Sequence, residues 1–335
     1  TGGENQPSSN FRIRQYINFL KNTIIIKDFS SKFGKYPPNS KFKRLIWIIQ
    51  ILTERLFQVI IINFSNYDCV IIQREMISTL HTFERFIKKP TILDIDDAIY
   101  LHRNGKFIEI IAKNCNAVIC GNSFLEQKFN NWNKNTFIIP TAVDTEKYTP
   151  LDSKKKYHNK IVIGWVGTSS NLRCIYQIEG AINHVIKKFP NVEFMVVSDS
   201  KPKFNLIEEY IFVKWSSEKQ VENLHKFDIG IMPLENNEWS KGKCSYKMLQ
   251  YMSCGIPVVV SPVGMNNEVL SKNDVGYGAE DDNDWIMYLE KIIKSPYLKF
   301  TLGQNGRRVV VENYSLKTLA LSFEKAIEST LQNNI

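Results

Sequence analysis

Two lysines four residues apart, Lys243 and Lys247, are the side chains whose type and spacing point most directly to chemistry. They lie at the start of a predicted helix over Tyr246–Ser253 that ends at Gly255, so both can project from one side of its N-terminal end. The unpaired backbone N–H groups and the dipole of a helix N-terminus favour an anion, and a pyrophosphate suits this combination of charges. The competing interpretation is a solvated helix face that carries two lysines.

A glycine turn after a buried strand is the second candidate for anion binding. The strand is predicted over Ile161–Val166, and Gly167 follows it directly. Thr168 and Ser169 come next, and Asn171 caps the helix that follows. Glycine lets the backbone approach a phosphate closely, and the two hydroxyl groups can donate hydrogen bonds to its oxygens. Many α/β proteins have such a turn without a ligand, so the turn alone is weak evidence.

These segments belong to a series of short Val- and Ile-rich runs that alternate with helical stretches, the pattern of parallel sheets with crossover helices. The polar run Asp152–Lys160 divides the series into two units and is the best predicted linker. Two such units form a cleft, and ligands bind beyond the carboxyl ends of the strands. The predicted strands are Thr23–Lys27, Cys69–Gln73, Thr91–Asp94, Ala117–Cys120, Thr136–Ile139, Ile161–Val166, Val192–Val197, Tyr210–Val213, Ile229–Met232 and Pro257–Ser261. The predicted helices are Arg12–Leu20, Phe42–Asn63, Lys106–Asn114, Ser123–Asn130, Asn171–Phe189, Glu218–Lys226, Tyr246–Ser253 and Ser315–Leu331.

The composition is that of an ordinary globular protein, since 43% of the 335 residues are hydrophobic and 23% are charged. Disordered, collagen-like and low-complexity architectures are therefore excluded. No run approaches the ~18–20 uninterrupted apolar residues of a membrane-spanning helix, because Gln50, Glu54, Arg55 and Gln58 break the most apolar region, Leu45–Phe64. No signal peptide is expected, because the first 20 residues lack an apolar core. The six cysteines form no CxxC pair and lie near no histidine at ligand spacing, which predicts reduced thiols in the cytoplasm and no metal site.

Positive charge is concentrated in the N-terminal half. The formal net charge is +9, and residues 1–150 carry 20 basic and 13 acidic side chains. Lys41, Lys43 and Arg44 open an apolar helix, and such a basic face can attract an anionic membrane surface. A solvated basic surface over an ordinary core helix is the alternative. No nucleic acid partner is expected, because the basic residues show neither an aromatic-interleaved groove pattern nor a DNA-binding motif.

Several of these segments together resemble retaining GT-B glycosyltransferases of family 4, over about residues 160–330. The matching motifs are Gly-Trp-Val-Gly-Thr-Ser (164–169), Phe-Asp-Ile-Gly-Ile-Met-Pro-Leu (227–234), Gly-Lys-Cys-Ser-Tyr-Lys-Met-Leu-Gln-Tyr-Met (242–252), Gly-Ile-Pro-Val-Val (255–259) and Glu-Asn-Tyr-Ser (312–315). Agreement in the N-terminal half is looser. The resemblance implies an α/β fold of the GT-B type, with two Rossmann-like domains that face each other across a cleft and a C-terminal helix that crosses back to the first. The implied domains are an acceptor-side domain over 1–150, a nucleotide-sugar domain over 151–314 and the returning helix over 315–335.

The resemblance also implies an activity: transfer of a sugar from a UDP- or GDP-sugar, with retention at the anomeric carbon. The implied acceptor is a glycan or lipid-linked glycan of cell-surface polysaccharide or glycoconjugate synthesis, which suggests a cytoplasmic protein peripheral to the inner face of a membrane. No cofactor or metal is required, because Lys243, Lys247 and the turn Gly167–Ser169 would neutralise the departing diphosphate. The nucleotide base would lie near Val213 and Lys214.

The helix motif of the family departs from its usual pattern in this chain. Two glutamates of the family correspond here to Gly242 and Gln250, of which Gln250 can still bind a ribose hydroxyl. Backbone groups of Gly264, Met265 and Asn266 can hold sugar hydroxyls. Because no carboxylate stands at Gly242, the alternative function is a catalytically degenerate sugar-nucleotide-binding partner subunit. An epimerase with the same architecture is a third class, which the lysine-bearing helix does not exclude.

An acidic cluster follows a predicted strand in the N-terminal half, at Asp94, Asp96 and Asp97. Hard cations prefer clustered carboxylates, but in a two-domain phosphate-binding enzyme an acceptor-binding or structural role is favoured over a metal. Asp97 and Glu75 lie near strand ends and are expected to orient an acceptor hydroxyl. The two histidines of this half are interpreted as ordinary helix or loop residues.

Overall fold

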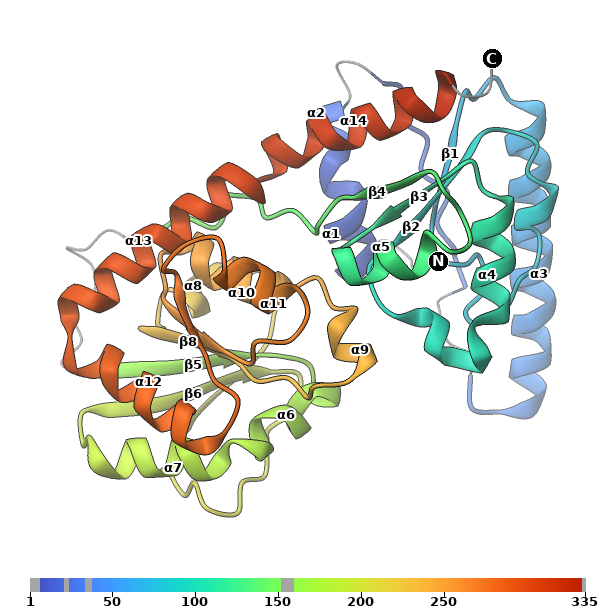
Figure 1. The fold of residues 1–335 in the computed structure, drawn as a ribbon. Coiled ribbons are helices and arrows are strands. Elements are labelled where there is room, and N and C mark those ends of the chain that lie inside the picture. The colour runs from blue at the N-terminus through green and yellow to red at the C-terminus, as the bar shows by residue number, and fades with distance from the viewer. Residues whose placement is uncertain (1–6, 21–23, 34–37, 152–159, 333–335) are drawn as a thin grey trace. The chain divides into compact units, whose positions relative to one another are not determined.

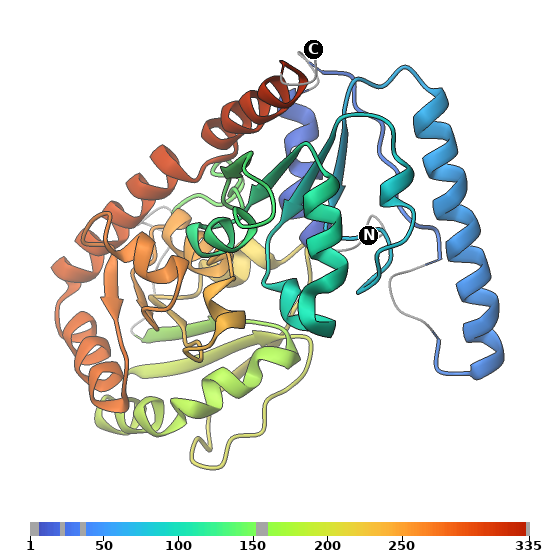
Figure 2. The same ribbon diagram turned by 45° about the vertical axis from the view of Figure 1, so that its right-hand side comes forward.

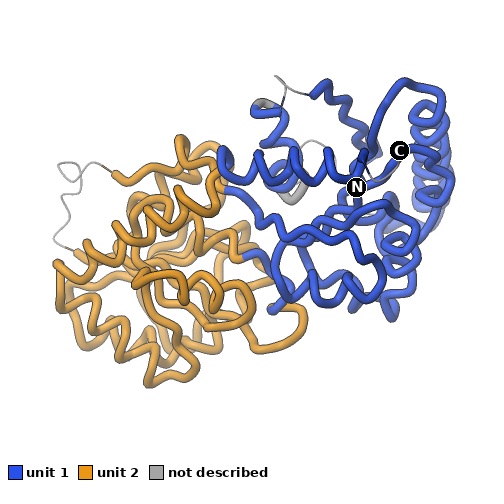
Figure 3. Tube along the Cα trace, turned by 45° about the horizontal axis from the view of Figure 1, so that its top comes forward, with its two compact units in different colours: residues 1–142, 241–244, 316–335 blue, residues 143–240, 245–315 orange. Residues whose placement is uncertain are grey.

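A computed structural model describes residues 7–20, 24–33, 38–151 and 160–332 of the chain. The chain forms two compact units (Figure 3). Unit 1 contains residues 1–142, 241–244 and 316–335, and unit 2 contains residues 143–240 and 245–315. Each unit has its own parallel sheet, as the α/β fold class predicts.

The sheet of unit 1 has four parallel strands in the order β1-β2-β3-β4 (Figure 1). The central strands β2 and β3 are buried along their whole length, as expected for apolar runs covered on both faces. Because the strands are parallel, their carboxyl ends lie at one edge of the sheet. The strands are β1 (Val70–Gln73), β2 (Thr91–Ile95), β3 (Ala117–Cys120) and β4 (Thr136–Ile138). The helices among them are η2 (Glu84–Phe86), η3 (Ile99–Gly105), α4 (Lys106–Asn114) and α5 (Ser123–Phe129).

The last helix, α14 (Leu316–Gln332), packs on unit 1 and confirms the predicted return of the C-terminal helix. Its apolar face shares a core with Ile92 of β2. Phe323 of this face stacks on Tyr16, with the ring centroids 5.0 Å apart. Tyr16 lies in the N-terminal segment, which consists of α1 (Pro7–Arg12), η1 (Arg14–Tyr16) and α2 (Ile17–Leu20).

The sheet of unit 2 has six parallel strands in the order β10-β9-β8-β5-β6-β7. The order reverses beside β5, and ligands of open α/β sheets bind at the carboxyl ends at such a switch point. The strands are β5 (Ile161–Val166), β6 (Val192–Ser198), β7 (Ile211–Lys214), β8 (Ile229–Met232), β9 (Val258–Val260) and β10 (Gly276–Gly278). The helices are η5 (Ser169–Asn171), α6 (Leu172–Gln177), α7 (Glu179–Lys188), α8 (Gln220–Leu224), α9 (Glu238–Lys241), α10 (Tyr246–Ser253), α11 (Met265–Leu270), α12 (Asp282–Lys294) and α13 (Pro296–Asn313).

Helices lie on both faces of this second sheet (Figure 2), and different side chains pack on the two faces. One face holds the main core, in which Ile182 of α7 and Trp285 of α12 join Phe194 of β6. The other face carries glycines that admit large neighbours. A Cβ at Gly230 of β8 would lie 2.5 Å from the Tyr251 ring, so α10 packs directly on the strand.

Three predicted elements differ from the structure in type or in continuity. Residues 24–27 form neither helix nor strand, and Ile25 is 99% exposed, because no neighbouring strand pairs with this segment among the described residues. The helix predicted over Arg12–Leu20 is broken at Ile13, and the one predicted over Asn171–Phe189 is broken at Ile178, because both residues have non-helical backbone angles.

The division into units differs from the predicted domain limits in two places. Residues 143–150 lie with unit 2, where Arg307 donates hydrogen bonds to the carbonyl oxygens of Thr145 (2.9 Å) and Tyr148 (2.7 Å). Residues 241–244 lie with unit 1, where Asn122 Nδ2 donates to the carbonyl oxygens of Lys241 and Lys243. The predicted linker lies mostly outside the described residues.

Helix α3 (Lys41–Phe64) of unit 1 is long and apolar enough to cross a membrane by length and composition. Only 22% of its most apolar window is buried in the described structure. The sequence predicted that the polar residues of this region rule out a membrane-length apolar helix. That prediction is wrong, because the most apolar window keeps a mean hydropathy of 1.8 in spite of them. Length and composition alone do not distinguish a spanning helix from one that lies along a surface.

Candidate active site

The carboxyl end of β5 in unit 2 is built around the indole of Trp165, which is 3% exposed. Gly167 follows the strand and passes directly over this ring. A Cβ at Gly167 would lie 1.9 Å from Trp165 Cη2, far inside van der Waals contact, so only glycine fits this turn. The backbone can therefore approach a ligand closely at the switch point of the sheet.

Helix α10 brings a cation to the same place. Tyr251 of α10 accepts a hydrogen bond from Val166 N–H at 2.9 Å, which fixes the helix on the end of β5. One turn earlier, the Lys247 Nζ lies 6.0 Å from the centroid of the Trp165 ring that underlies Gly167. Lys247 and the glycine turn, predicted separately from the sequence, thus share one aromatic neighbour.

Lys243 does not share a helix face with Lys247, so the predicted common projection of the two lysines is wrong. Helix α10 begins at Tyr246, and Ser245 before it has a left-handed backbone with φ +49°. Lys243 therefore lies outside the helix, where the spacing rule for positions four apart does not apply. It belongs to the segment 241–244 of unit 1.

The polar groups of the predicted phosphate turn already bond to protein atoms. Gly167 N–H donates to the Val197 carbonyl at 3.0 Å. Ser169 donates to Asp199 from its N–H (2.6 Å) and from its hydroxyl (2.8 Å), and Thr168 Oγ1 lies 2.9 Å from Ser170 Oγ. The slight burial of Asp199 opposes its ionisation, but the bonds from Ser169 outweigh it and hold the pKa of Asp199 below its usual value. A phosphate that binds at Ser169 must therefore displace the Asp199 carboxylate or share the Ser169 donors with it. The sequence alone did not predict the role of Asp199.

The remaining predicted donor residues lie at the ends of other strands or in α10. Val213 and Lys214 end the edge strand β7, where Lys214 pairs in register with Ser198 beside Asp199. Gln250 lies in the buried part of α10 and is 2% exposed.

The predicted sugar-hydroxyl turn follows β9. Gly264 has φ +55° and ψ −129°, a conformation that favours glycine. Met265 and Asn266 begin α11 with buried side chains. Asn266 N–H donates to the Val263 carbonyl at 3.2 Å, and its Nδ2 donates to the Ser261 carbonyl at 2.9 Å. These bonds fix the shape of the turn and use the backbone N–H of Asn266.

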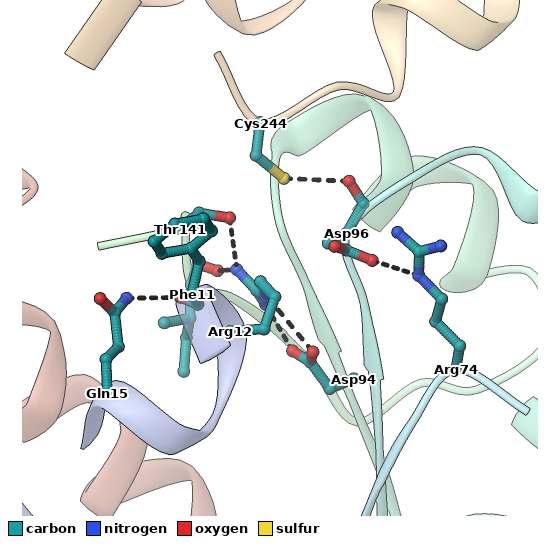
Figure 4. A network of polar contacts seen from close by, with 9 residues as sticks. Phe11, Arg12, Gln15, Arg74, Asp94, Asp96, Thr141 and Cys244 are labelled. Carbon is teal, nitrogen blue, oxygen red and sulfur yellow. Dashed lines mark hydrogen bonds and ion pairs between the residues drawn. The ribbon is translucent and has the colours of Figure 1, made fainter. Parts of the chain in front are cut away.

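In unit 1, the carboxyl ends of β1 and β2 bring together a group of charged side chains (Figure 4). Arg74 follows β1, and its guanidinium bonds to Asp96 (Nε to Oδ1, 2.6 Å) and to Asp97. Burial opposes ionisation of Asp96, but Arg74 outweighs it and holds the pKa of Asp96 below its usual value. Burial and the neighbouring Asp96 charge raise the pKa of Asp97, against Arg74 and Lys243. Sequence reasoning missed Arg74; its one signal was a basic residue directly after a buried strand.

Glu75 lies in a strained loop next to this cluster. Arg74 and Thr79 on either side have left-handed backbones with φ +58° and +61°, which costs of order 1 kcal/mol or more each in residues other than glycine. Glu75 is 5% exposed, and its Oε1 accepts a hydrogen bond from Thr79 N–H at 2.9 Å. Its Oε2 is buried and has no hydrogen-bond partner among the described residues. A buried carboxylate oxygen without a partner is costly and suggests a ligand hydroxyl.

Asp94 has a structural role. It forms a buried ion pair with Arg12 of α1, and Arg12 also donates to the Ile139 carbonyl at 2.7 Å (Figure 4). The pair fixes the N-terminal helix to the ends of β2 and β4. Among the described residues, no group of three or more His, Cys, Asp or Glu side chains could hold a metal ion.

The segment 241–244 packs against the same acidic group. Cys244 Sγ lies 3.2 Å from the Asp96 carbonyl oxygen and donates to it (Figure 4). Burial raises the pKa of the Cys244 thiol to about 12, so it stays protonated at neutral pH. A Cβ at Gly242 would lie 2.7 Å from Ala98 Cβ and 2.8 Å from Ala98 N. The position of the first family carboxylate is therefore occupied by a glycine that this packing requires.

Comparisons with known proteins agree with this architecture. Residues 160–295 match the family model described as "Glycosyl transferases group 1", whereas no curated protein sequence matches the chain. The structure of sucrose-phosphate synthase from Thermosynechococcus elongatus is similar to 92% of this chain and 86% of its own, with a TM-score of 0.69 and 15% identity. Anabaena HepE, solved with UDP and glucose, is similar over 93% of this chain and 88% of its own, with a TM-score of 0.64 and 12% identity. S. aureus TarM, solved with UDP, is similar over 72% of this chain and 51% of its own, with a TM-score of 0.57 and 18% identity.

At these identities the structural likeness establishes the fold alone, and the family match is limited to residues 160–295. That match covers the Gly167 turn, the lysine-bearing helix α10 and the turn at Gly264. The two parallel-sheet units and the returning helix α14 thus have the GT-B fold, and residues 160–295 of this chain are similar to glycosyl transferases group 1.

Proposed function

We propose that the protein transfers a sugar from UDP-sugar to a hydroxyl group of a lipid-linked glycan, with retention at the anomeric carbon. The observation that carries the donor assignment is the convergence of Lys247, the Gly167 turn and the end of β5 on the Trp165 ring. UDP is favoured over GDP as the nucleotide because HepE and TarM were solved with UDP.

Unit 2 would bind the donor. The diphosphate lies at the Gly167 turn, where Lys247 and the N-terminal end of α10 meet the negative charge that develops as UDP departs. The base lies at Val213 and Lys214, and the ribose is close to Gln250. The proposed reaction needs no metal, because Lys247 and the N-terminal end of α10 neutralise the leaving group.

Unit 1 would bind the acceptor. Glu75 Oε2 accepts a hydrogen bond from one acceptor hydroxyl, and Asp97 orients the reacting hydroxyl, with Arg74 fixing the carboxylate. In the transfer step, the bond between the anomeric carbon and the β-phosphate oxygen breaks, and the acceptor oxygen bonds to the same face of that carbon. The acceptor proton passes to the departing phosphate oxygen, so atoms and charge balance.

A lipid-linked acceptor places the reaction in the synthesis of a cell-surface polysaccharide or glycoconjugate, on the cytoplasmic face of a membrane. The free cysteines and the basic start of α3 are compatible with that location.

A second function, a sugar-nucleotide-binding subunit without transferase activity, is favoured by one observation. Gly242 stands where the family has a carboxylate, and its contact with Ala98 leaves no room for a side chain. Such a subunit would bind UDP through Lys247 and release no sugar.

Thermal unfolding with UDP, GDP, ADP and CDP, with and without magnesium, tests the donor site. A ligand at 100 times its Kd adds about 2.7 kcal/mol, which raises the midpoint by several degrees. We expect UDP alone to stabilise the protein without magnesium. Stabilisation by none of the four, or only with metal, would contradict the proposed site. Acceptor-dependent release of UDP from UDP-sugars then separates a transferase from a binding subunit, which would bind UDP and release none.

A further inference from the structure

Helix α3 of unit 1 is apolar on its exposed side as well as over much of its buried side, unlike a usual surface helix. Its buried side includes Arg55 and Gln58, and Arg55 donates a hydrogen bond to Gln58 Oε1 at 2.7 Å. Glu54 accepts hydrogen bonds from Ser31 Oγ (2.7 Å) and Lys32 N–H (2.9 Å). The charged side chains in the middle of the helix are thus engaged on the protein side, and the opposite side is left to apolar groups.

The outward side of α3 forms one continuous apolar face. From Leu45 to Phe64, a span of about 30 Å at 1.5 Å per residue, no exposed residue is charged, and only Gln50 and Thr53 are polar. Such a face exceeds the scattered apolar side chains that a soluble monomer exposes. Figures 1 and 2 both show α3 at the margin of unit 1, with no described element on its outer side. The exposed large side chains, here called the α3 face, are Phe42, Leu45, Ile46, Ile48, Ile49, Leu52, Leu56, Phe57, Ile60, Ile61 and Phe64.

Basic side chains lie at both ends of the α3 face. Lys41, Lys43 and Arg44 are exposed at its start. At its end, Asn63 bonds to the Phe86 carbonyl (2.8 Å) and to Lys88 N–H (2.9 Å), which places the basic segment 85–89 beside Phe64. In that segment Arg85 and Lys88 are exposed. An apolar strip between two basic clusters complements a layer of anionic headgroups over acyl chains.

A second copy of the chain fits this face less well. Pairing two α3 helices, parallel or antiparallel, would bring basic clusters together at both ends, and like charges repel. A spanning helix fits less well again, because it would carry Glu54 and Arg55 into the bilayer core and break the bonds of Glu54 to Ser31 and Lys32.

We propose that the α3 face docks unit 1 on an anionic phospholipid bilayer, with the helix lying in the plane of the interface. The face enters the boundary between headgroups and acyl chains, and the two basic clusters contact the headgroups. This docking goes beyond the proposed transfer reaction and does not depend on it, because no residue of either candidate substrate site lies on the face.

The test is co-sedimentation of the full chain with vesicles of pure phosphatidylcholine and of equal parts phosphatidylcholine and phosphatidylglycerol. The apolar variant is Ile49→Gln, Leu56→Gln and Ile60→Gln, at positions 57%, 42% and 42% exposed. Its matched control is Met287→Gln, Tyr297→Gln and Phe300→Gln, which removes three exposed apolar groups from unit 2. A third variant replaces Lys41, Lys43 and Arg44 by glutamine.

We expect the parent to bind the mixed vesicles more tightly than the neutral ones, and the unit 2 control to bind like the parent. The apolar variant should bind at least about tenfold more weakly to mixed vesicles. The basic variant should bind mixed vesicles about tenfold or more weakly than the parent, and its binding to neutral vesicles should change little. Because all substituted positions are exposed, each variant should keep the parental unfolding midpoint.

Three results would overturn the docking proposal. The apolar variant could bind vesicles as tightly as the parent. The parent could be a dimer that the apolar variant breaks, with no vesicle binding, which would assign the face to a second copy. The reconstituted parent could also resist extraction by alkaline carbonate, which would make α3 a spanning helix. Stabilisation by UDP is measured in the same samples, so loss of the donor site and loss of vesicle binding are told apart.

Discussion

Replacing Lys247 by methionine tests the donor site most directly, because methionine keeps an apolar stem near Trp165 and removes the charge. Lys247 is half-buried, so its attraction for a phosphate is screened less than at an open surface. A hydrogen bond to a charged group contributes about 1.5–3 kcal/mol. That range lies below the ceiling of about 4 kcal/mol for two unit charges about 4 Å apart at an effective dielectric constant of about 20. The Kd of UDP should therefore rise about 10- to 150-fold.

The assay is calorimetric titration of UDP into the full chain, with Lys291→Met as the matched control. Lys291 Nζ also lies over an aromatic ring, 4.7 Å from the centroid of Tyr277, but on α12. Each variant loses a cation–π contact of about 0.5–1 kcal/mol, so the two unfolding midpoints should be alike. Only Lys247→Met should weaken UDP binding. Parental UDP affinity in Lys247→Met would refute the assignment of this lysine to the diphosphate, and equal weakening by Lys291→Met would trace the effect to stability.

Three further predictions concern the turn at β5 and the acceptor loop. Gly167→Ala places a Cβ 1.9 Å from Trp165, so we expect a loss of about 1–3 kcal/mol in the free energy of unfolding and weaker UDP binding; a stable variant with parental affinity would contradict the close approach. Glu75→Gln should raise the KM for the acceptor at least about tenfold, as measured by acceptor-dependent UDP release. The Kd of UDP, measured by titration, should stay unchanged. An unchanged KM would remove Glu75 from the acceptor site. The pKa of Asp199 is lowered in the fold by its bonds from Ser169, so its stabilising contribution is present above the unfolded value of about 3.9 and is lost as the pH falls through the lowered folded value. Asp199→Asn should therefore lose less stability than the parent between about pH 6 and about pH 3, measured by urea midpoints, and an identical acid profile would count against these bonds.

Three buried strands and two helices, α4 and α10, were predicted with their observed limits. Strands β3, β5 and β8 match because each is an apolar run bounded by polar residues or turns, and such runs are buried wherever the sheet lies. Helix α10 matches because Gly255, with φ +70°, ends it. Local sequence decides these elements.

Sequence could not place the residues whose roles arise from tertiary contacts. Arg74 acquires its role only when β1 pairs with β2 and brings it beside Asp96 and Asp97. Lys243 leaves the helix because Ser245 is left-handed, and the segment 241–244 packs on unit 1 through Asn122. No periodicity in the sequence encodes such a contact across more than a hundred positions.

The return of α14 to unit 1 fixes the order in which the two units can be completed on the ribosome. Unit 2 has all its residues once Ser315 has emerged, whereas unit 1, although synthesised first, lacks α14 until residues 316–332 have emerged as well. Until then the ring of Tyr16 has no Phe323 to stack on, and the apolar surface around Ile92 stays open. The nascent chain therefore carries an unfinished N-terminal half past a finished C-terminal one, a period in which that half is exposed to aggregation and to chaperones.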